Sequence, residues 1–64
     1  MLEWIAATLD YPARTENDDD DITLAHALRA IPERNFRVLR VIYNETVDPV
    51  AVVTAYFDDE TADL

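Results

Sequence analysis

The chemically reactive side chains of this sequence are few, and they limit the reactions that it could catalyse. The chain has 64 residues with one histidine, no cysteine and no glycine, and serine and lysine are also absent. A serine or cysteine nucleophile and a glycine-rich phosphate loop are therefore excluded. The groups that remain for proton transfer and phosphate binding are His26, the three tyrosines and the five arginines.

Three of these side chains, His26, Arg37 and Tyr56, are predicted to lie on one face of a β-sheet. RNA cleavage by attack of the 2′-hydroxyl needs a proton acceptor, a proton donor and positive charge at the phosphate, and these residues supply all three without a metal ion or cofactor. In the alternative interpretation they are structural: His26 packs within a strand, and Arg37 stacks on Tyr56 across two strands. We favour the structural interpretation, because a net charge of −9 repels RNA.

The acidic run at residues 16–21 is the most obvious candidate for a metal site. A calcium-binding loop needs acids at alternate positions, a glycine at its sharp turn and a distal glutamate. Four consecutive aspartates without glycine do not fit this pattern. We therefore predict an exposed acidic loop and no metal site.

A short helix is predicted ahead of this loop, at residues 1–11. Leu2, Ile5 and Leu9 recur at helical spacing and form one apolar stripe. Pro12 ends the helix, because proline lacks the N–H group and disfavours helical geometry at the residue before it. Trp4 lies off the stripe and is expected at the boundary between helix and sheet.

Strands are predicted at residues 35–44 and 50–58, which are rich in β-branched and aromatic residues and are separated by turn residues. Residues 22–31 fit either a capped helix or an alternating strand. The tail at residues 59–64 is expected to be frayed. Together these elements predict a single α+β domain over residues 1–64.

Several of these segments also resemble a known family of proteins. The similar segments are Pro12 and residues 29–32, 37–43 and 52–57. They resemble a bacterial family of small domains of unknown function, grouped with the RelE- and BrnT-type toxins of the barnase–EndoU–colicin–RelE fold. The resemblance implies that residues 22–31 form a strand, so that one short N-terminal helix packs on an antiparallel β-meander of three to four strands. It also implies a toxin-type endoribonuclease with arginine and tyrosine supplied by the sheet, although this chain begins after a histidine and an arginine that are candidate catalytic groups in family members.

The predicted register assigns each side chain to one face of the sheet. If residues 32–35 form the first loop, Ile31 pairs with Phe36, and if residues 44–49 form the second, Tyr43 pairs with Val50. The predicted core face under the helix holds Ala25, Ala27, Val38, Ile42, Ala51, Val53, Ala55 and Phe57. The opposite face holds the three candidate catalytic residues and a predicted interface of Leu24, Leu28, Leu39, Val41, Tyr43, Val50, Val52 and Thr54.

This second apolar face indicates a binding role, because exposed apolar surfaces of this kind mark association sites. A second copy of the chain is the simplest partner, since two-fold dimers are the commonest assembly. We therefore predict a non-catalytic or degenerate RelE-like interaction module that acts as a homodimer or with a protein partner. The alternatives are a metal-independent endoribonuclease of a toxin–antitoxin system, and an acidic antitoxin-like protein that binds a basic partner.

Two further predictions concern location and ion pairing. No apolar stretch is long enough to cross a membrane, and Glu3 stands where a signal peptide carries basic residues, so a cytoplasmic location without membrane attachment is expected. Arg29 and Arg40 fall on the predicted core face. They are expected to reach its edge and pair there with acids such as Glu3, Asp10 or Asp58.

Overall fold

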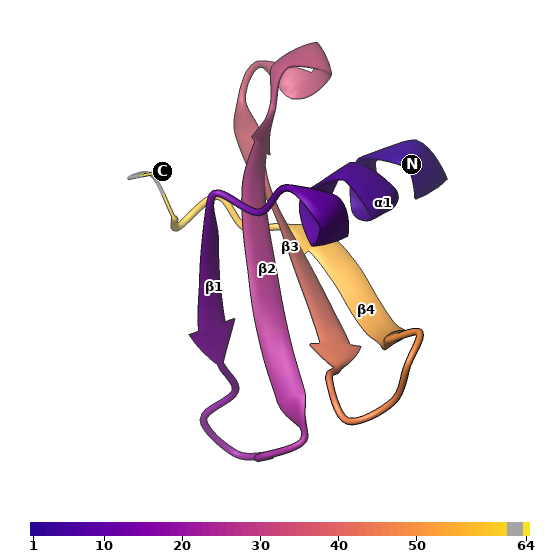
Figure 1. Ribbon diagram of the computed structural model, residues 1–64. Helices are drawn as coiled ribbons and strands as arrows, with labels where there is room; N and C mark the ends of the chain where they lie inside the picture. The colour runs from indigo at the N-terminus through magenta and orange to yellow at the C-terminus, as the bar shows by residue number, and fades with distance from the viewer. Residues whose placement is uncertain (62–63) are drawn as a thin grey trace.

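One helix packs against a four-stranded antiparallel sheet, as a computed structural model of the chain describes for residues 1–61 and 64. Helix α1 (Leu2–Asp10) lies across one face of the sheet (Figure 1). The strands follow one another in chain order as a meander, and the predicted α+β fold class is confirmed. Their bounds are β1 (Arg14–Asn17), β2 (Leu24–Ile31), β3 (Arg37–Asn44) and β4 (Ala51–Phe57), with a short 3₁₀ helix η1 (Pro32–Arg34) between β2 and β3.

Helix α1 ends at Asp10, two residues before Pro12, as the sequence predicts. Ile5 and Leu9 pack on the core together with Trp4, whereas Leu2 is 83% exposed. At 100° per residue, Leu2 lies about 90° from the centre of the stripe that includes Trp4 and Leu9, so its predicted place in the stripe is wrong. Thr8 on the same stripe is fully buried, and its hydroxyl donates a 2.7 Å hydrogen bond to the Trp4 carbonyl. None of the helices in the described part of the chain is long and apolar enough to cross a membrane.

The core lies between α1 and the central strands. Its buried residues are Ile31, Leu39 and Val41, and Ala55 and Phe57 of β4 pack against them. Leu39 and Val41 were predicted at the opposite, partner-binding face, so this part of the prediction is wrong.

The turn between β2 and β3 explains the error. Ile31 pairs with Arg37, so the turn holds five residues, one more than predicted, and the Phe36 N–H donates a 2.9 Å hydrogen bond to the Ile31 carbonyl. Asn35 and Phe36 accommodate the extra residue with φ angles of 56° and 62°. A shift of one residue moves every side chain of a strand to the other face. Val38 and Ile42, predicted in the core, consequently face away from α1.

The pairing of β3 with β4 also differs from the prediction. Arg40 pairs with Tyr56, and Tyr43 pairs with Val52 rather than with Val50. The register shifts between Ile42 and Tyr43, which leaves Val53 as an extra residue on β4. A bulge of this kind has no simple sequence signature, because it requires no particular side chain at this position.

Strand β1 occupies part of the segment predicted as an acidic loop. Glu16 pairs with His26, and the loop itself begins at Asp18. The Asp18 carboxylate accepts hydrogen bonds of 3.1 and 2.9 Å from the N–H groups of Asp20 and Asp21. The acidic run therefore continues the sheet before it turns.

The segment after β4 turns back across the sheet on the side opposite α1 (Figure 1). The Asp58 N–H donates a 2.8 Å hydrogen bond to the Val38 carbonyl, and the Thr61 N–H donates to the Asp58 carbonyl at 3.3 Å. The predicted frayed tail thus makes ordered contacts up to Thr61. Residues 62–63 of that prediction lie outside the described residues.

Truncating Leu39 tests this register. Leu39→Ala is expected to lower the free energy of unfolding by about 3 kcal/mol, because it leaves a cavity under α1. Val47→Ala, at an exposed position of the loop between β3 and β4, is expected to change it by less than about 0.5 kcal/mol. Urea unfolding followed by Trp4 fluorescence measures both values. Equal effects of the two substitutions would contradict the placement of Leu39 in the core.

Candidate functional site

A cluster of polar side chains lies on the sheet face opposite α1 and centres on Arg40. We define the outer-face cluster as Glu16, Asp18, His26, Arg40 and Asp58. Strand pairing positions the cluster. Glu16 of β1 lies beside His26 of β2, and Arg40 of β3 lies between Leu28 of β2 and Tyr56 of β4. The Arg40 side chain is only 11% exposed.

Arg40 joins four segments of the chain. Its Nε donates to Asp58 at 2.8 Å, and its Nη2 donates to the Thr61 hydroxyl at 3.3 Å. Its Nη1 donates to Glu16 at 3.0 Å and to His26 Nδ1 at 2.7 Å. One guanidinium thereby connects β1, β2 and β3 to the segment after β4.

Both ring nitrogens of His26 have partners. Nδ1 accepts from Arg40, and Nε2 donates to Asp18 Oδ1 at 2.7 Å. These partners require the neutral ring with its hydrogen on Nε2, since an arginine N–H can only donate. A general base needs a nitrogen lone pair that can reach the substrate. In this arrangement neither nitrogen of His26 is available without breaking a hydrogen bond.

The charges of the cluster stabilise one another. Burial lowers the pKa of Arg40, but its hydrogen bonds to Glu16 and Asp58 outweigh burial and leave that pKa raised. The hydrogen bond from Arg40 lowers the pKa of Glu16 and that of Asp58. The pKa of Asp18 is lowered by its hydrogen bond to His26 and by the backbone N–H groups of its own loop. All three carboxylates are thus held in their charged form.

The three predicted catalytic residues do not come together. The register puts Arg37 on the α1 side of β3. Its guanidinium binds Asp59 through two hydrogen bonds of 3.0 Å and lies 4.6 Å from the centre of the Phe57 ring. His26 and Tyr56 lie on the outer face. The prediction that all three share a face is wrong, because the extra turn residue moves Arg37 to the other side. The predicted stacking of Arg37 on Tyr56 is wrong for the same reason.

The predicted interface is likewise divided between the two faces. Leu28, Leu39 and Val41 are fully buried within the chain, so they are not available to a partner. Leu24 and Thr54 lie on the outer face, whereas Tyr43 and Val52 pair with each other and lie on the α1 face. Val50 precedes β4 and is exposed. The predicted interface residues that stay exposed are Val50, Val52 and Thr54.

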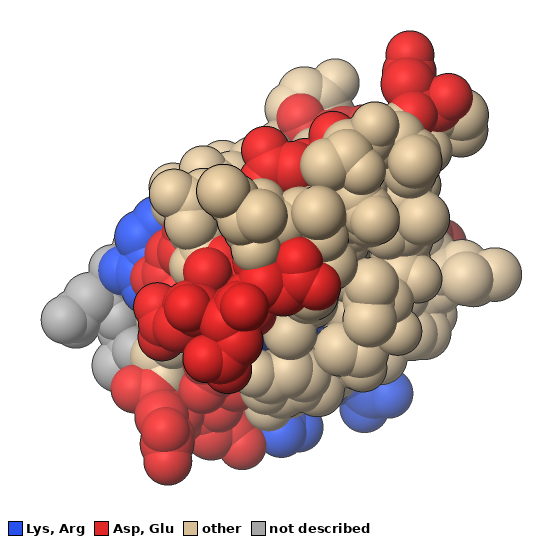
Figure 2. All heavy atoms as spheres, turned by 90° about the horizontal axis from the view of Figure 1, so that it is seen from below, with Lys and Arg blue, Asp and Glu red and all other residues tan. Residues whose placement is uncertain are grey.

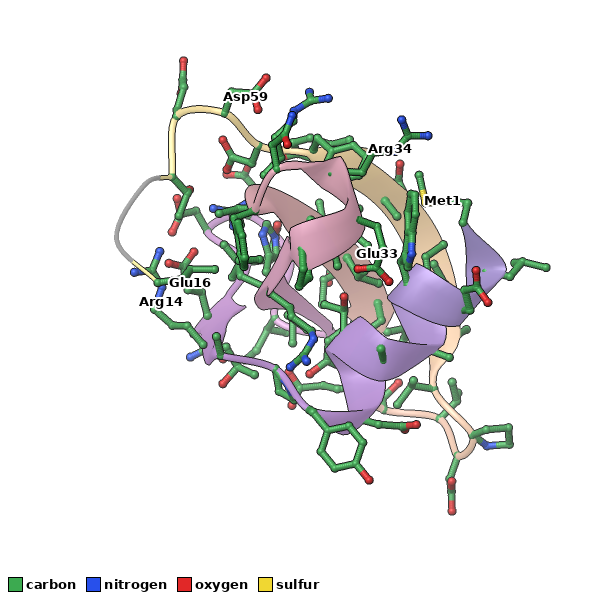
Figure 3. All side chains as sticks on the ribbon, turned by 90° about the horizontal axis from the view of Figure 1, so that it is seen from above. Met1, Arg14, Glu16, Glu33, Arg34 and Asp59 are labelled. Atoms are coloured by element: carbon green, nitrogen blue, oxygen red, sulfur yellow. The ribbon has the colours of Figure 1, made fainter. Side chains whose placement is uncertain are left out.

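The remaining arginines have structural partners. Arg29 donates a 2.8 Å hydrogen bond to the Tyr11 carbonyl at the end of α1, rather than to one of the expected acids. The expected pair of Arg40 with Asp58 is present, but on the outer face. Arg14 lies 3.1 Å from Glu16 on β1, as Figure 3 shows. Arg34 lies 5.2 Å from the ring centre of Trp4.

The second candidate feature is the β4 edge, which we define as residues Ala51–Phe57. Strand β4 is at one end of the sheet and pairs only with β3. Residues 49–57 contain no charged side chain. Val53 and Tyr56 are 58% and 46% exposed. Edge strands with exposed apolar side chains and no charge readily pair with another strand. The described residues enclose no pocket.

Comparison of the chain with family models, with curated proteins and with solved structures found no match.

Removing the Arg40 charge tests the structural role of the outer-face cluster. Arg40→Met keeps the apolar stem and is expected to lower the free energy of unfolding by about 2 kcal/mol, because Glu16, Asp58 and His26 lose a shared partner. Arg14→Met is the matched control, since Arg14 also contacts Glu16 but is exposed, and it is expected to cost less than about 0.5 kcal/mol. Urea unfolding measures both. Equal losses would show that burial of Arg40 contributes nothing.

The lowered pKa values of the cluster predict acid sensitivity. The ordinary values are 4.5 for Glu16 and 3.8 for Asp58, and both are lowered in the folded chain. Their contribution to stability is therefore complete above the ordinary values and is lost as the pH falls through the lowered ones. Urea unfolding at a series of pH values from about 7 to 3 should show this loss. The free energy of unfolding of Arg40→Met should depend less steeply on pH than that of the unaltered chain. Equal slopes would contradict the ion pairs of Arg40 as the cause of the acid sensitivity.

Proposed function

We propose that this chain is a small, non-catalytic interaction domain of the cytoplasm that binds a polypeptide strand along the β4 edge. The observation that carries the proposal is the uncharged, exposed β4 edge of an otherwise strongly acidic chain. Strand addition gains affinity from main-chain hydrogen bonds and specificity from the alternating side chains. The apolar residues around β4 supply such side chains.

The outer-face cluster supports a binding role over catalysis. Arg37 and His26 lie on opposite faces, and both nitrogens of His26 have partners. Two carboxylates bind Arg40 and a third binds His26, so the cluster carries more negative than positive charge where an RNA phosphate would have to bind. The RelE-like assignment, the toxin-type endoribonuclease and the acidic antitoxin-like protein stay predictions from the sequence.

Photo-crosslinking in the source organism tests binding at the β4 edge. A photoreactive phenylalanine derivative is placed at the position of Tyr56 on β4, or at that of Tyr11, which is 72% exposed beyond the end of α1. Position 56 is expected to give discrete crosslinked products, and position 11 is the matched control. No products at position 56, or the same products at both positions, would overturn the proposal.

An RNA-cleavage assay separates this proposal from the endoribonuclease. The purified chain, His26→Ala and Arg37→Ala are incubated with total RNA at low and at high salt. No cleavage above background is expected from any of them, because the candidate groups are not assembled in one site. Cleavage by the unaltered chain that both substitutions abolish would overturn the non-catalytic assignment.

A further inference from the structure

We propose that the strand bound at the β4 edge is β4 of a second copy of the same chain. The two sheets then join, antiparallel and about a two-fold axis, into one sheet of eight strands, four from each copy. This inference rests on the proposed function and names its partner. Three observations support it: the unpaired backbone of β4, the distribution of charge and the exposed side chains.

The backbone of β4 directs hydrogen-bonding groups away from the sheet. The Asp58 N–H donates to the Val38 carbonyl, so residue 58 faces β3. In an antiparallel pair the N–H and C=O groups of successive residues alternate between the two sides of a strand. Ala55 and Phe57 therefore direct both groups outward. Another antiparallel β4 offers the same pattern and can pair with them.

The charge distribution favours this edge for self-association. With a net charge of −9, two copies repel each other over most of their surfaces. Residues 49–57 carry no charge, and the two acids that follow β4 are already paired, Asp58 with Arg40 and Asp59 with Arg37. At the other edge, β1 has only four residues, carries the charged Arg14 and Glu16, and leads into the loop of Asp18–Asp21, so a second copy would approach an acidic surface there. Figure 2 shows the largest group of acidic side chains on the β1 side, whereas the β4 side is mainly free of charge.

The side chains of β4 are self-complementary. Val52, Val53 and Tyr56 are 44%, 58% and 46% exposed, and each would pack against apolar groups of an identical strand. The bulge at Val53 leaves residues 54–57 as a regular segment for pairing. A chain of 64 residues buries only a small core. Association through β4 would therefore add a large part of its stability.

Light scattering of the purified chain tests the self-association. The unaltered chain is expected at twice the mass of one copy, with the dimer fraction rising with salt as the repulsion is screened. Val53→Lys places a charge at the edge and is expected to give single chains. Thr15→Lys introduces the same charge on β1, the opposite edge strand, and should leave the dimer unchanged.

A second variant removes only a backbone donor. Ala55→Pro deletes an N–H that faces outward, so it should abolish the dimer while the bonds to β3 stay intact. Circular dichroism and Trp4 fluorescence show whether each variant is folded. A folded Ala55→Pro or Val53→Lys variant that still forms dimers would overturn the proposed interface.

Spin labels give the geometry of the dimer directly. The chain has no cysteine, so Thr54→Cys and Thr15→Cys each create a single labelling position. Labels at position 54 lie on adjacent strands, at most about four residues apart along them, or about 15 Å, and should couple more strongly than those at position 15. Labels at position 15 are separated by seven strand spacings, roughly 34 Å in a flat sheet. Shorter separations at position 15 than at position 54 would overturn pairing through β4.

The two proposals fail in different ways. A monomer in solution that still gives crosslinks from position 56 to a different protein would overturn self-pairing and leave the interaction domain in place. A monomer without crosslinks at position 56 would overturn both. Crosslinks between two copies of the chain, together with the doubled mass, would support both.

Discussion

The pairing of Ile31 with Arg37 determines which residues of β3 face α1. Because the turn between them holds five residues, Leu39 and Val41 point toward the helix and form the core. The same register directs Arg40 to the other side, where it meets Glu16, His26 and Asp58. This one turn therefore determines both which apolar residues of β3 form the core and which polar residue of β3 joins the outer-face cluster. A turn shorter by one residue would bury Arg40 under the helix and expose Leu39.

Arg40 makes the outer face a connected structure. A strand of four residues such as β1 gains little from its own backbone pairing, and Arg40 holds it through Glu16. The guanidinium also fixes the orientation of His26, which in turn holds the acidic loop through Asp18. The cost of burying an arginine is thus offset by several charged or polar partners. In a strongly acidic chain, each such cation also reduces repulsion among the carboxylates around it.

The helix and strands β3 and β4 follow from local patterns, whereas the pattern of residues 22–31 fitted a helix as well as a strand and only the family resemblance favoured the strand β2. Pro12 ends the helix, and the β-branched residues of β3 and β4 favour extended structure. Strand β1 was missed because its polar residues carry no apolar alternation, and its stability comes from pairing with β2 and from Glu16. The register was missed because Asn35 and Phe36 adopt left-handed geometry without a glycine to indicate it. The candidate site depends on that register, so the central role of Arg40 could not be predicted, although its pair with Asp58 was among the expected ones.

The two aspartates after β4 bind two arginines of β3. Asp58 binds Arg40, and Asp59 binds Arg37, which lies three residues earlier on the strand. The turn that follows β4 therefore holds β3 at two places through one short segment. Proteolytic cleavage between Phe57 and Asp58 would disconnect both ion pairs and the backbone bond to Val38 in one event. The peptide bond between these residues is consequently a point at which a single cut by a protease would remove both ion pairs that hold β3 to the end of the chain.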